Sequence, residues 1–456
     1  MILWNYIRRK MMETPSQTIC EGSAKMTFEE MCVFAENYAK KLTAPYYGIL
    51  CKSEMAAAMA LLSCIAAGKP AILMPSRYGA EVYNKIIDRS APPCILSDSD
   101  NGLTTIVLDT QTKTKKLHSS TAVVLFTSGS TGIPKGILLS QKNLLSNIKD
   151  ISSYFPINKN DSILISRPIY HSSVLTGELL VSLCNGAKIV FSSESFQPQN
   201  ILNIMREQKI SVFGSTPTLL STFSKFVRKS NDLSIRLLSI SGECMTSGMA
   251  HTIRKAFPNA KVYCGYGLSE ASPRVAYLPP EQFDSSPTAA GVPLPSVNLI
   301  IINESGHITT PFEIGELLVN GPNVMLGYFD DRARTKATLC EGWLHTGDLA
   351  CFDSEGLLHI KGRKDDMIIR AGMNIYPAEI ESVLSTDTRV ESILVYGYQE
   401  NDTQLIGMTI SGSFSSTDEV LALCRNKLPP YQIPSKITIS DKPDFLASGK
   451  KKRKKY

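Results

Sequence analysis

A short run of small and hydroxylated residues is the clearest sign of chemistry in this chain. Thr127, Ser128, Gly129, Ser130, Thr131 and Gly132 follow an apolar segment and lead into Pro134-Lys135-Gly136. Small residues let the backbone approach phosphate oxygens, hydroxyl and amide groups donate hydrogen bonds, and Lys135 adds a positive charge. A Walker loop would begin a helix at its lysine, whereas here residues 137–139 continue as a strand. The run therefore predicts a phosphate-binding loop of another kind.

Five further short motifs follow in order along the chain. They are Gly242-Glu243, the pentapeptide 266–270 (Tyr-Gly-Leu-Ser-Glu), the hexapeptide 343–348 (Trp-Leu-His-Thr-Gly-Asp), Gly362-Arg363-Lys364-Asp365 and Ser448-Gly449-Lys450. Taken singly, such motifs are commonly plain turns, surface charges or, for Lys450, one more cation in a basic tail. Their presence together, in this order after the phosphate loop, favours a single nucleotide site.

With these motifs the chain resembles the adenylate-forming superfamily over nearly its whole length. That superfamily includes acyl-CoA synthetases, the adenylation domains of peptide synthetases and firefly luciferase. The resemblance implies an enzyme that uses ATP and Mg²⁺ to convert a carboxylic acid into an acyl-adenylate, with release of pyrophosphate. It also implies transfer of the acyl group to a phosphopantetheine thiol.

The same resemblance assigns roles around the nucleotide. Tyr266 would stack on adenine, Ser269 would contact the α-phosphate and Glu270 would help to hold Mg²⁺. Asp348 would accept hydrogen bonds from both ribose hydroxyls, since a carboxylate has two oxygens, and Arg363 would add a ribose contact. The adjoining turn beside adenine would be formed by Gly242 and Glu243. Cys264 stands where the family often has an adenine-facing Asn or Gln, so one usual base contact is missing.

Two residues carry the implied catalysis and movement. Lys450 would reach into the cleft and neutralise charge that builds on the carboxylate and the α-phosphate in the transition state. Asp365 occupies the family's hinge position, about which a small C-terminal domain rotates between adenylation and thioester formation. No Ser/His/Asp or Cys/His nucleophile set is evident, so electrostatics and positioning must carry the reaction.

The segment Tyr170-His171-Ser172-Ser173 bears on the acid. Amino-acid-activating domains usually have Phe-Asp here, and replacement of that Asp by His171 disfavours an α-amino acid and favours a fatty, aryl or other simple acid; a packed histidine without substrate contact is the alternative. By resemblance the acid pocket is lined by His171, Ser172, Leu175, Gly214, Ser239, Ser241, Gly265, Pro273 and Arg274. Several of these are small, which leaves room for an aryl group or a medium-length chain. Arg274 could pair with a second carboxylate of the substrate, or be an exposed or structurally paired arginine.

The acceptor is expected to be coenzyme A or the phosphopantetheine of an acyl or peptidyl carrier protein. Both Gly372 and the basic tail are compatible with either acceptor, and the segment around His171 favours an acyl- or aryl-CoA ligase. A stand-alone loader of a carrier protein is the alternative. Two weaker alternatives are a luciferase-like oxygenase and a non-catalytic adenylate-binding module. The module is disfavoured because Lys135, Glu270, Asp348 and Lys450 are all present.

Composition excludes several other classes. The 456 residues are 43% hydrophobic and 20% charged, as in an ordinary globular protein, and the net charge of +6 is matched by six basic residues among the last seven. The rest of the chain is nearly balanced, so no nucleic-acid surface is expected. The eleven cysteines show no zinc spacing and fit a reduced, cytoplasmic protein. No secretory signal is seen, and the apolar stretch 55–67 is too short to span a bilayer, so it predicts a buried helix.

The order of elements predicts an α/β fold. Strands at 121–126, 162–166, 187–191, 210–213 and 237–241 alternate with helices at 199–207 and 218–229, which indicates two mainly parallel sheets flanked by helices. Short strands at 297–302, 315–320, 347–352 and 357–361, with a hairpin turn at 353–356, predict a small β-barrel-like subdomain at about 291–362. A helix at 377–384, strands at 391–398 and 404–411 and a helix at 417–427 predict a mobile α+β domain. We place the large domain at 1–362 and the small one at 363–456.

Overall fold

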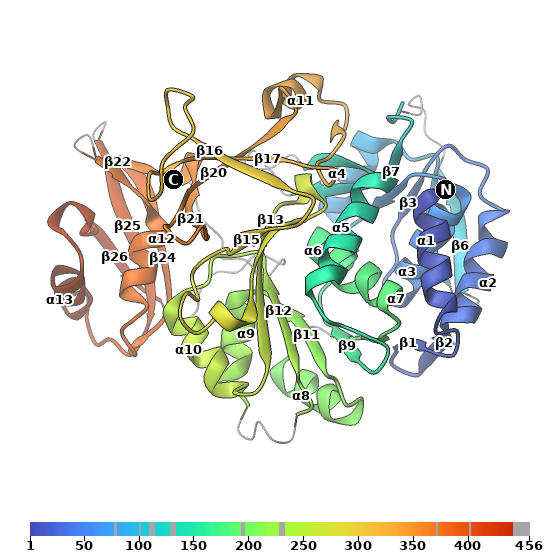
Figure 1. Ribbon diagram of the computed structural model, residues 1–456, viewed down its shortest axis with the longest axis horizontal. Coiled ribbons are helices and arrows are strands. Elements are labelled where there is room, and N and C mark those ends of the chain that lie inside the picture. The colour runs from blue at the N-terminus through green and yellow to red at the C-terminus, as the bar shows by residue number, and fades with distance from the viewer. Residues whose placement is uncertain are drawn as a thin grey trace.

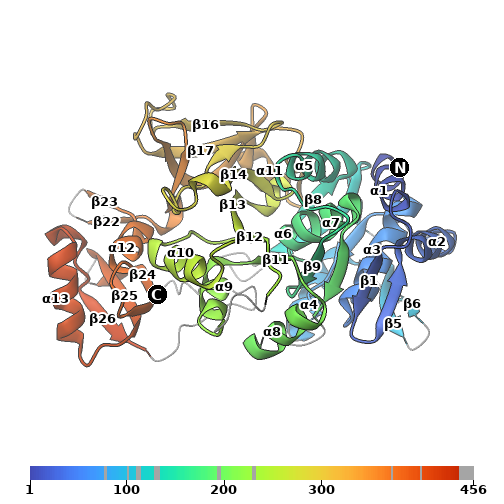
Figure 2. The ribbon, with the colours of Figure 1, turned by 60° about the horizontal axis from the view of Figure 1, so that its bottom comes forward.

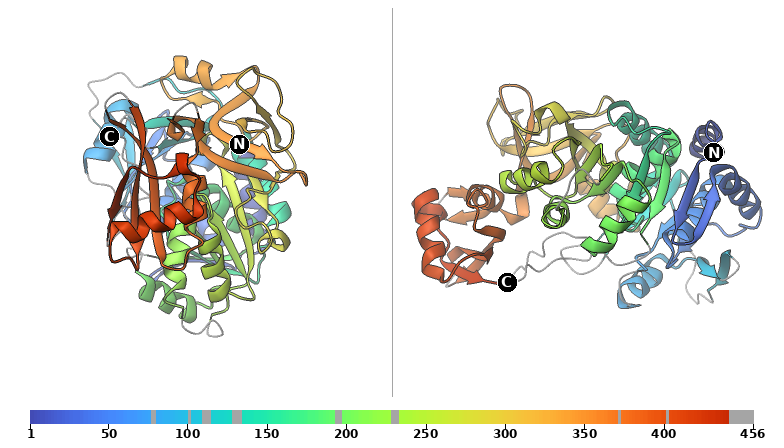
Figure 3. Two further views of the ribbon diagram at one scale, coloured as in Figure 1. Left: turned by 90° about the vertical axis from the view of Figure 1, so that its left-hand side faces the viewer. Right: turned by 90° about the horizontal axis from the view of Figure 1, so that it is seen from below.

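The computed structural model describes residues 1–76, 80–99, 102–108, 115–127, 134–192, 197–227, 233–370, 373–400 and 403–440. Two large mixed sheets make up most of the molecule, and a third sheet and a separate C-terminal unit complete it (Figure 1). Figures 1 and 2 place the C-terminal unit at the opposite end of the molecule from the N-terminal helices, and the right-hand view of Figure 3 agrees.

The first sheet has nine strands and carries most of the predicted acid pocket. Its order is β15 (Val292–Pro293), β14 (Arg274–Leu278), β13 (Lys261–Gly267), β12 (Leu237–Ser241), β11 (Val212–Ser215), β9 (Ser162–Ile165), β10 (Lys188–Phe191), β1 (Thr18–Glu21) and β2 (Ala24–Thr27). The strands from β13 to β1 run parallel, and antiparallel strands close both edges. Helices α8 (Pro198–Glu207), α9 (Pro217–Ser224) and α10 (Ser247–Ala256) pack on one face.

The second sheet has seven strands and contains the strand before the phosphate loop. Its order is β18 (Gly327–Tyr328), β8 (Lys135–Ser140), β7 (Thr121–Thr127), β4 (Ala71–Leu73), β3 (Tyr47–Ile49), β5 (Cys94–Ser99) and β6 (Gly102–Val107). The helices that precede, connect or follow its strands in the sequence are α1 (Ile2–Met12), α2 (Phe28–Ala39), α3 (Glu54–Ala67), α4 (Ala80–Ser90) and α5 (Gln141–Tyr154). A short helical segment follows β9: α6 (Ser172–Val174), the π-helix η1 (Leu175–Leu180) and α7 (Val181–Asn185).

One hydrophobic core joins these two sheets. It contains Ile163 and Ile189 from the first sheet, Val123 and Leu125 from the second, and the helices between them. Helix α3 is buried along nearly its whole length, as predicted from its apolar sequence. Within the described parts of the chain, every helix is too short or too polar to span a membrane.

The third sheet is antiparallel and branched. Strand β20 (Trp343–Phe352) pairs with β17 (Gly315–Asn320), β19 (Leu339–Cys340) and β21 (Leu358–Arg363), and β16 (Asn298–Ile302) pairs with β17. Helix α11 (Arg332–Thr338) precedes β19. A hairpin turn at 353–356 joins β20 to β21, as predicted.

The C-terminal unit has its own small core. Strands β22 (Ile368–Arg370) and β23 (Met373–Ile375) form a hairpin, and β24 (Val390–Glu400), β25 (Thr403–Gly412) and β26 (Lys436–Ile439) form a three-stranded sheet. Helices α12 (Pro377–Leu384) and α13 (Thr417–Lys427) pack on it. The unit contacts the end of helix α9 at the Lys225–Glu391 ion pair, 3.6 Å, and is joined to β21 by the turn η5 (Lys364–Asp366).

The α/β class predicted from sequence is confirmed, with differences at element ends. Helix α9 stops at Ser224 rather than 229, because the amides of the next three residues, 225–227, bond to carbonyls three rather than four residues back. Strand β20 starts four residues earlier than expected, because Trp343 pairs with Cys340. Gly347 lies inside the strand with φ +68°, a conformation that glycine adopts readily, where the pairing with β17 shifts register.

A buried carboxylate ties together the amino ends of the parallel strands. Asp161, just before β9, accepts two hydrogen bonds from the guanidinium of Arg236, which precedes β12, and one from Ser211 Oγ, 2.7 Å, which precedes β11. It also accepts one from the Asn158 amide, 2.9 Å. Burial alone would raise the pKa of Asp161, but these donors hold it below its ordinary value, so the carboxylate stays charged.

We predict that Asp161→Ala lowers the free energy of unfolding by about 3 kcal/mol, because Arg236 loses its partner and three strand starts lose their common acceptor. Urea denaturation followed by circular dichroism measures this. The matched control is Glu36→Ala, which removes the exposed partner of Arg8 and should cost under about 1 kcal/mol. Similar losses in the two variants would contradict the assigned role of Asp161.

Candidate active site

The predicted acid-pocket residues share one face of the first sheet, near the carboxyl ends of its strands. Gly214 on β11 is opposite Ser239 on β12, and Ser241 is opposite Gly265 on β13. Residues paired across neighbouring strands point to the same face, as do residues two apart on one strand. The alternate residues, such as Phe213 and Ile240, pack instead into the core with α8, α9 and α10. Ligands of parallel α/β sheets bind outside the carboxyl ends of strands, which is where this polar row lies.

The π-helix η1 crosses the polar row. Glu178 of this helix lies so close to Gly214 that a methyl group added to the glycine would be 2.5 Å from the carboxylate. Glu178 and Arg167 are both buried and form an ion pair. π-helical turns are rare and often mark functional sites. Leu175, another predicted pocket residue, is the first residue of the helix and is fully buried.

A hydroxyl pair joins the predicted acid pocket to the predicted nucleotide motif. Ser172 at the start of α6 and Ser269 at the start of η3 (Ser269–Ala271) have their Oγ atoms 2.9 Å apart. His171 immediately precedes α6, and its ring lies 4.6 Å from that of Tyr170, centroid to centroid. Two segments almost a hundred residues apart in sequence thus meet where acid and phosphate would have to meet.

Three residues assigned to the adenosine also come together. Tyr266 donates its hydroxyl hydrogen to Asp348 Oδ2, and Arg363 Nη1 donates to Asp348 Oδ1 at 2.8 Å. Burial, reinforced by the neighbouring carboxylate, raises the pKa of Tyr266 well above its ordinary value, so the phenol stays a neutral donor. The pairing of Asp348 with Arg363 across β20 and β21 brings the two residues predicted to contact ribose into register. A carboxylate has about four lone-pair sites, so Asp348 can accept further hydrogen bonds.

Glu270 has a partner that sequence reasoning missed. The Tyr328 hydroxyl donates to Glu270 Oε1 at 2.9 Å, while the Met325 amide donates to the Glu270 carbonyl at 2.8 Å. Burial, and then Glu270, raise the pKa of Tyr328, so it too remains a donor. Tyr328 lies on β18, which pairs with β8 beside Lys135. No sequence motif contains Tyr328. The only sequence signal for its contact with Glu270 is that Tyr328 lies near the end of the region that forms the two large sheets.

Glu270 Oε2 has no partner among the described residues, which bears on a metal ion. Mg²⁺ takes oxygen ligands and is commonly held by one or two carboxylates together with substrate phosphates. Within the described ranges no group of three His, Cys, Asp or Glu side chains could hold a metal. A single oriented carboxylate therefore fits an ion that the nucleotide phosphates would help to hold.

The strands on either side of the phosphate loop pair closely. Thr127, the last residue of β7, is opposite Lys135, the first of β8. A methyl group added to Gly136 would lie 2.8 Å from Phe329 Cβ, so the glycine allows β18 to pack against this hairpin. The loop residues Ser128, Gly129, Ser130, Thr131 and Gly132 lie outside the described residues, and so do Lys450 and Gly372.

The remaining predicted residues are placed less directly. Gly242 is exposed with φ +100°, which suits the turn after β12. Glu243 accepts a hydrogen bond from the Thr218 amide, 3.2 Å, in the first turn of α9, so in this structure its carboxylate supports the start of a helix. Asp365 is exposed in the turn η5 between β21 and the C-terminal unit. Pro273 is buried next to Arg274.

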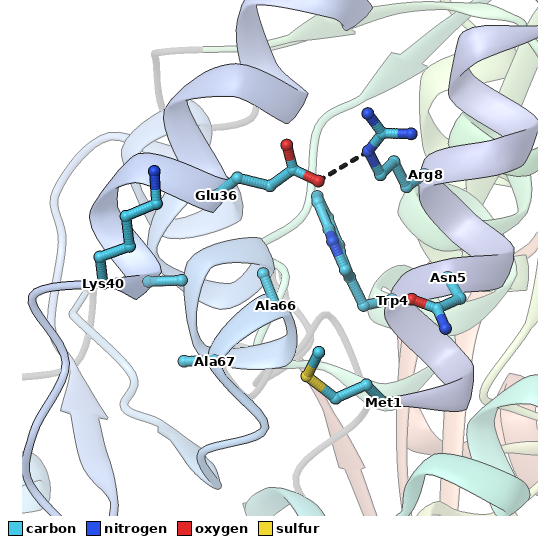
Figure 4. A pocket seen from close by; sticks show the side chains of 9 residues that line it. Met1, Trp4, Asn5, Arg8, Glu36, Lys40, Ala66 and Ala67 are labelled. Carbon is cyan, nitrogen blue, oxygen red and sulfur yellow. Dashed lines mark hydrogen bonds and ion pairs between the residues drawn. The ribbon is translucent and has the colours of Figure 1, made fainter.

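A cavity at the other end of the molecule is separate from this site. It has a volume of about 520 Å³ and lies between α1, α2 and α3, lined among others by Trp4, Arg8 and Glu36 (Figure 4). The Arg8–Glu36 ion pair crosses its edge. None of the predicted site residues lines it.

Comparison with known proteins agrees with the geometry. Residues 7–329 match the AMP-binding enzyme family. The chain belongs to the AMP-binding enzyme family. Among relatives of this AMP-binding enzyme, feruloyl-CoA synthase from an Amycolatopsis species is 32% identical over 334 residues, covering 72% of this chain and 67% of the relative. The 2-succinylbenzoate–CoA ligase of Bacillus subtilis is 27% identical, and the alignment covers 98% of this chain and 96% of the relative. The resemblance to acyl- and aryl-acid ligases predicted from sequence is confirmed.

Solved structures lead to the same family. O-succinylbenzoate coenzyme A synthetase from Bacillus subtilis in complex with AMP superposes with a TM-score of 0.83 at 26% identity, over 98% of this chain and 96% of that one. A benzoate CoA ligase from Burkholderia xenovorans has a TM-score of 0.87 over 98% of each chain; at 18% identity it shows the fold alone.

We predict that Tyr266→Phe and Asp348→Ala affect AMP binding to different degrees. Phenylalanine keeps the ring for stacking and removes only the bond to Asp348, so the dissociation constant for AMP should rise by about threefold or less. Alanine at position 348 removes the predicted ribose acceptor and takes the carboxylate partner from Arg363, so the constant should rise by about 30-fold or more. Isothermal titration calorimetry with AMP measures both, and equal losses would contradict the roles assigned to ring and carboxylate.

Proposed function

We propose that this AMP-binding enzyme is an acid–thiol ligase that forms an acyl-adenylate from ATP and a carboxylic acid and then makes the acyl-CoA thioester. The observation that carries the proposal is the contact between Ser172 and Ser269. It joins the polar row on the first sheet to the turn that contains Glu270 and follows Tyr266, so an acid on one side and an α-phosphate on the other would meet at these hydroxyls.

The nucleotide is proposed to bind along β13, η3 and β20. Tyr266 supplies an aromatic face, Asp348 supplies acceptors for two ribose hydroxyls, and Arg363 orients Asp348. The phosphates would lie toward Thr127 and Lys135, at the mouth of the β7–β8 hairpin. Bound Mg²⁺ would offset phosphate charge beside Glu270, which Tyr328 orients.

The chemistry needs no nucleophile from the protein. An oxygen of the substrate carboxylate attacks the α-phosphorus and pyrophosphate leaves; the sulfur of the thiol then attacks the acyl carbon, and AMP leaves as the thiol proton is lost. The hydroxyls of Ser172 and Ser269 hold acid and phosphate close together, so proximity contributes to the rate. Lys450 is proposed to neutralise the charge that grows between them in the first step.

Coenzyme A is proposed as the acceptor, because the relatives described above are named as coenzyme A ligases or synthetases. A carrier protein that bears phosphopantetheine presents the same thiol and becomes an outcome of the assay. None of the eleven cysteines forms a disulfide in the structure, and seven of them are buried. The cytoplasmic location expected from sequence stays a prediction.

The two half-reactions are proposed to use two positions of the C-terminal unit, with residues 1–362 as the stationary domain and Asp365 as the hinge. Apart from contacts of the connecting segment 363–366, two ion pairs of the described residues link the parts: Lys361 contacts Glu379 at 3.1 Å, and Lys225 contacts Glu391 at 3.6 Å. Both pairs are partly exposed to solvent, and such pairs contribute little to stability. A contact surface of this kind suits a domain that moves.

Exchange of labelled pyrophosphate into ATP tests the first step. With purified protein, Mg²⁺ and panels of fatty, aryl, dicarboxylic and amino acids, we expect exchange with one class of acid and none with α-amino acids. Addition of coenzyme A or of a phosphopantetheinylated carrier protein, followed by mass spectrometry of the products, identifies the acceptor. A folded protein that binds AMP but exchanges pyrophosphate with no acid would contradict the proposed function.

Variants at the two proposed moving parts should give opposite patterns. Lys450→Ala should lower adenylation by about 100-fold or more, through lost charge stabilisation, and spare thioester formation from added acyl-adenylate. Asp365→Pro fixes φ at the hinge and should spare adenylation but lower thioester formation. Pyrophosphate exchange and single-turnover thioester formation measure the two steps, with Lys452→Ala in the tail as a control for charge. Parallel losses in both steps for either variant would contradict its role.

A further inference from the structure

Arg274 is a buried cation on the polar face of the first sheet. Its side chain comes from the start of β14, is only 4% exposed and reaches back over β13. A methyl group added to Gly265 would lie 1.6 Å from Nη1, and one added to Gly177 of the π-helix would lie 3.3 Å from Nη2. The guanidinium therefore lies between β13 and η1, in the space that side chains at these two glycines would fill.

The glycines beside Arg274 are explained by space and not by backbone conformation. Neither Gly177, Gly214 nor Gly265 has a positive φ, so any residue could adopt these backbone angles. At Gly265 and Gly214 a side chain would instead strike Arg274 or Glu178. The sequence thus keeps this face free of side chains where two charged groups lie on it.

Within the described parts of the chain, no carboxylate forms an ion pair with Arg274. Arg167 and Glu178, on the same face, neutralise each other as a buried ion pair. The side chain of Arg274 makes no ion pair or hydrogen bond within the described parts of the chain, and its Nε is buried without a partner. Burial of an unpaired charge is costly, so buried arginines are normally paired. Arg274 is thus a buried cation without a charged partner among the described residues.

The backbone of Arg274 is nevertheless held in one place. Asn147 on α5 accepts from the Arg274 amide at 3.1 Å and donates to its carbonyl at 2.8 Å, and Asn323 donates to the same carbonyl at 3.0 Å. Both asparagines are fully buried. Three hydrogen bonds therefore fix the backbone of Arg274, while its side-chain charge has no partner among the described residues. Such an arginine is positioned to bind a charged group from outside the chain.

We propose that the acid activated by this enzyme is a dicarboxylic acid, whose second carboxylate pairs with Arg274 while the first reacts beside Ser172 and Ser269. This inference rests on the proposed function and names its substrate class. The planar guanidinium can bind a carboxylate through two parallel hydrogen bonds, which gives both strength and orientation. The bound acid would then supply a negative charge beside Arg274.

The test compares each dicarboxylic acid with its monomethyl ester in the unmodified enzyme. The ester keeps the chain and the reacting carboxylate and replaces the second charge with a neutral methyl ester. Across a series that includes glutarate, adipate, suberate and 4-carboxyphenylacetate, the best diacid should exceed its ester in kcat/KM for pyrophosphate exchange by about 30-fold or more, as expected when a buried charge loses its partner. Equal values for diacid and ester throughout would overturn the proposal.

Arg274→Met removes the charge and keeps most of the volume. It should lower kcat/KM for the diacid by about 30-fold or more and leave that for the ester nearly unchanged, so the preference is lost. The melting temperature without ligand should not fall, because an unpaired buried charge is removed. Arg332→Met, at an exposed site on α11, is the matched control and should change neither value. Equal loss for diacid and ester would mean that Arg274 serves the reacting end, and would overturn the assignment.

A binding measurement separates this inference from the proposed function. In the presence of AMP, the preferred diacid should raise the melting temperature of the unmodified protein and of Arg332→Met, but not of Arg274→Met. If no acid supports exchange but the diacid still stabilises in this pattern, the ligase function fails and the Arg274 site stands. If monocarboxylic acids are exchanged and no diacid binds, the ligase function stands and the Arg274 site is overturned.

Discussion

The reversal of the chain between β13 and β14 is the constraint on which the rest of the site depends. Tyr266, Ser269, Glu270 and Arg274 all lie on this one stretch, so their relative positions follow from how the reversal is held. It is held by polar side chains that are themselves buried: Asn147 and Asn323 bond to its backbone, and the Ser272 hydroxyl donates to the Asn323 carbonyl at 2.7 Å. Buried backbone groups must be paired, and here the pairing fixes the active geometry at the same time.

These two asparagines also join separate parts of the fold. Asn147 belongs to α5, which follows the second sheet, and Asn323 follows β17 of the third sheet. The residues just after Asn323 also hold the turn in place. The Met325 amide donates to the Glu270 carbonyl, and the Tyr328 hydroxyl donates to the Glu270 side chain. All three sheets therefore meet at one short turn. A change in packing at any of them is expected to reach the phosphate and acid groups together.

Much of the fold and part of the site follow from the sequence. Alternating strands and helices predict the α/β class, and the apolar run in α3 predicts its burial. The motif residues Tyr266, Asp348 and Arg363 are brought together as their resemblance implies. Tyr328, Asn147 and Asn323 could not be predicted, since each acts through long-range hydrogen bonds and belongs to no local pattern. The state of Arg274 was also undecided, because burial and pairing depend on Gly265 and Gly177, which lie on other elements.

The two ends of the parallel strands are built by opposite rules. At the amino ends, Asp161 is buried and all its hydrogen-bonding capacity is used by Arg236, Ser211 and the backbone, so its charge serves stability. At the carboxyl ends, Arg274 is equally buried and its charge has no protein partner among the described residues. A chain that can satisfy a buried carboxylate at one edge of a sheet with four donors has the means to pair an arginine at the other. An unpaired charge at the edge where ligands bind lowers the stability of the fold but can recognise a ligand of opposite charge. This is the physical reason for expecting an anionic group on the substrate.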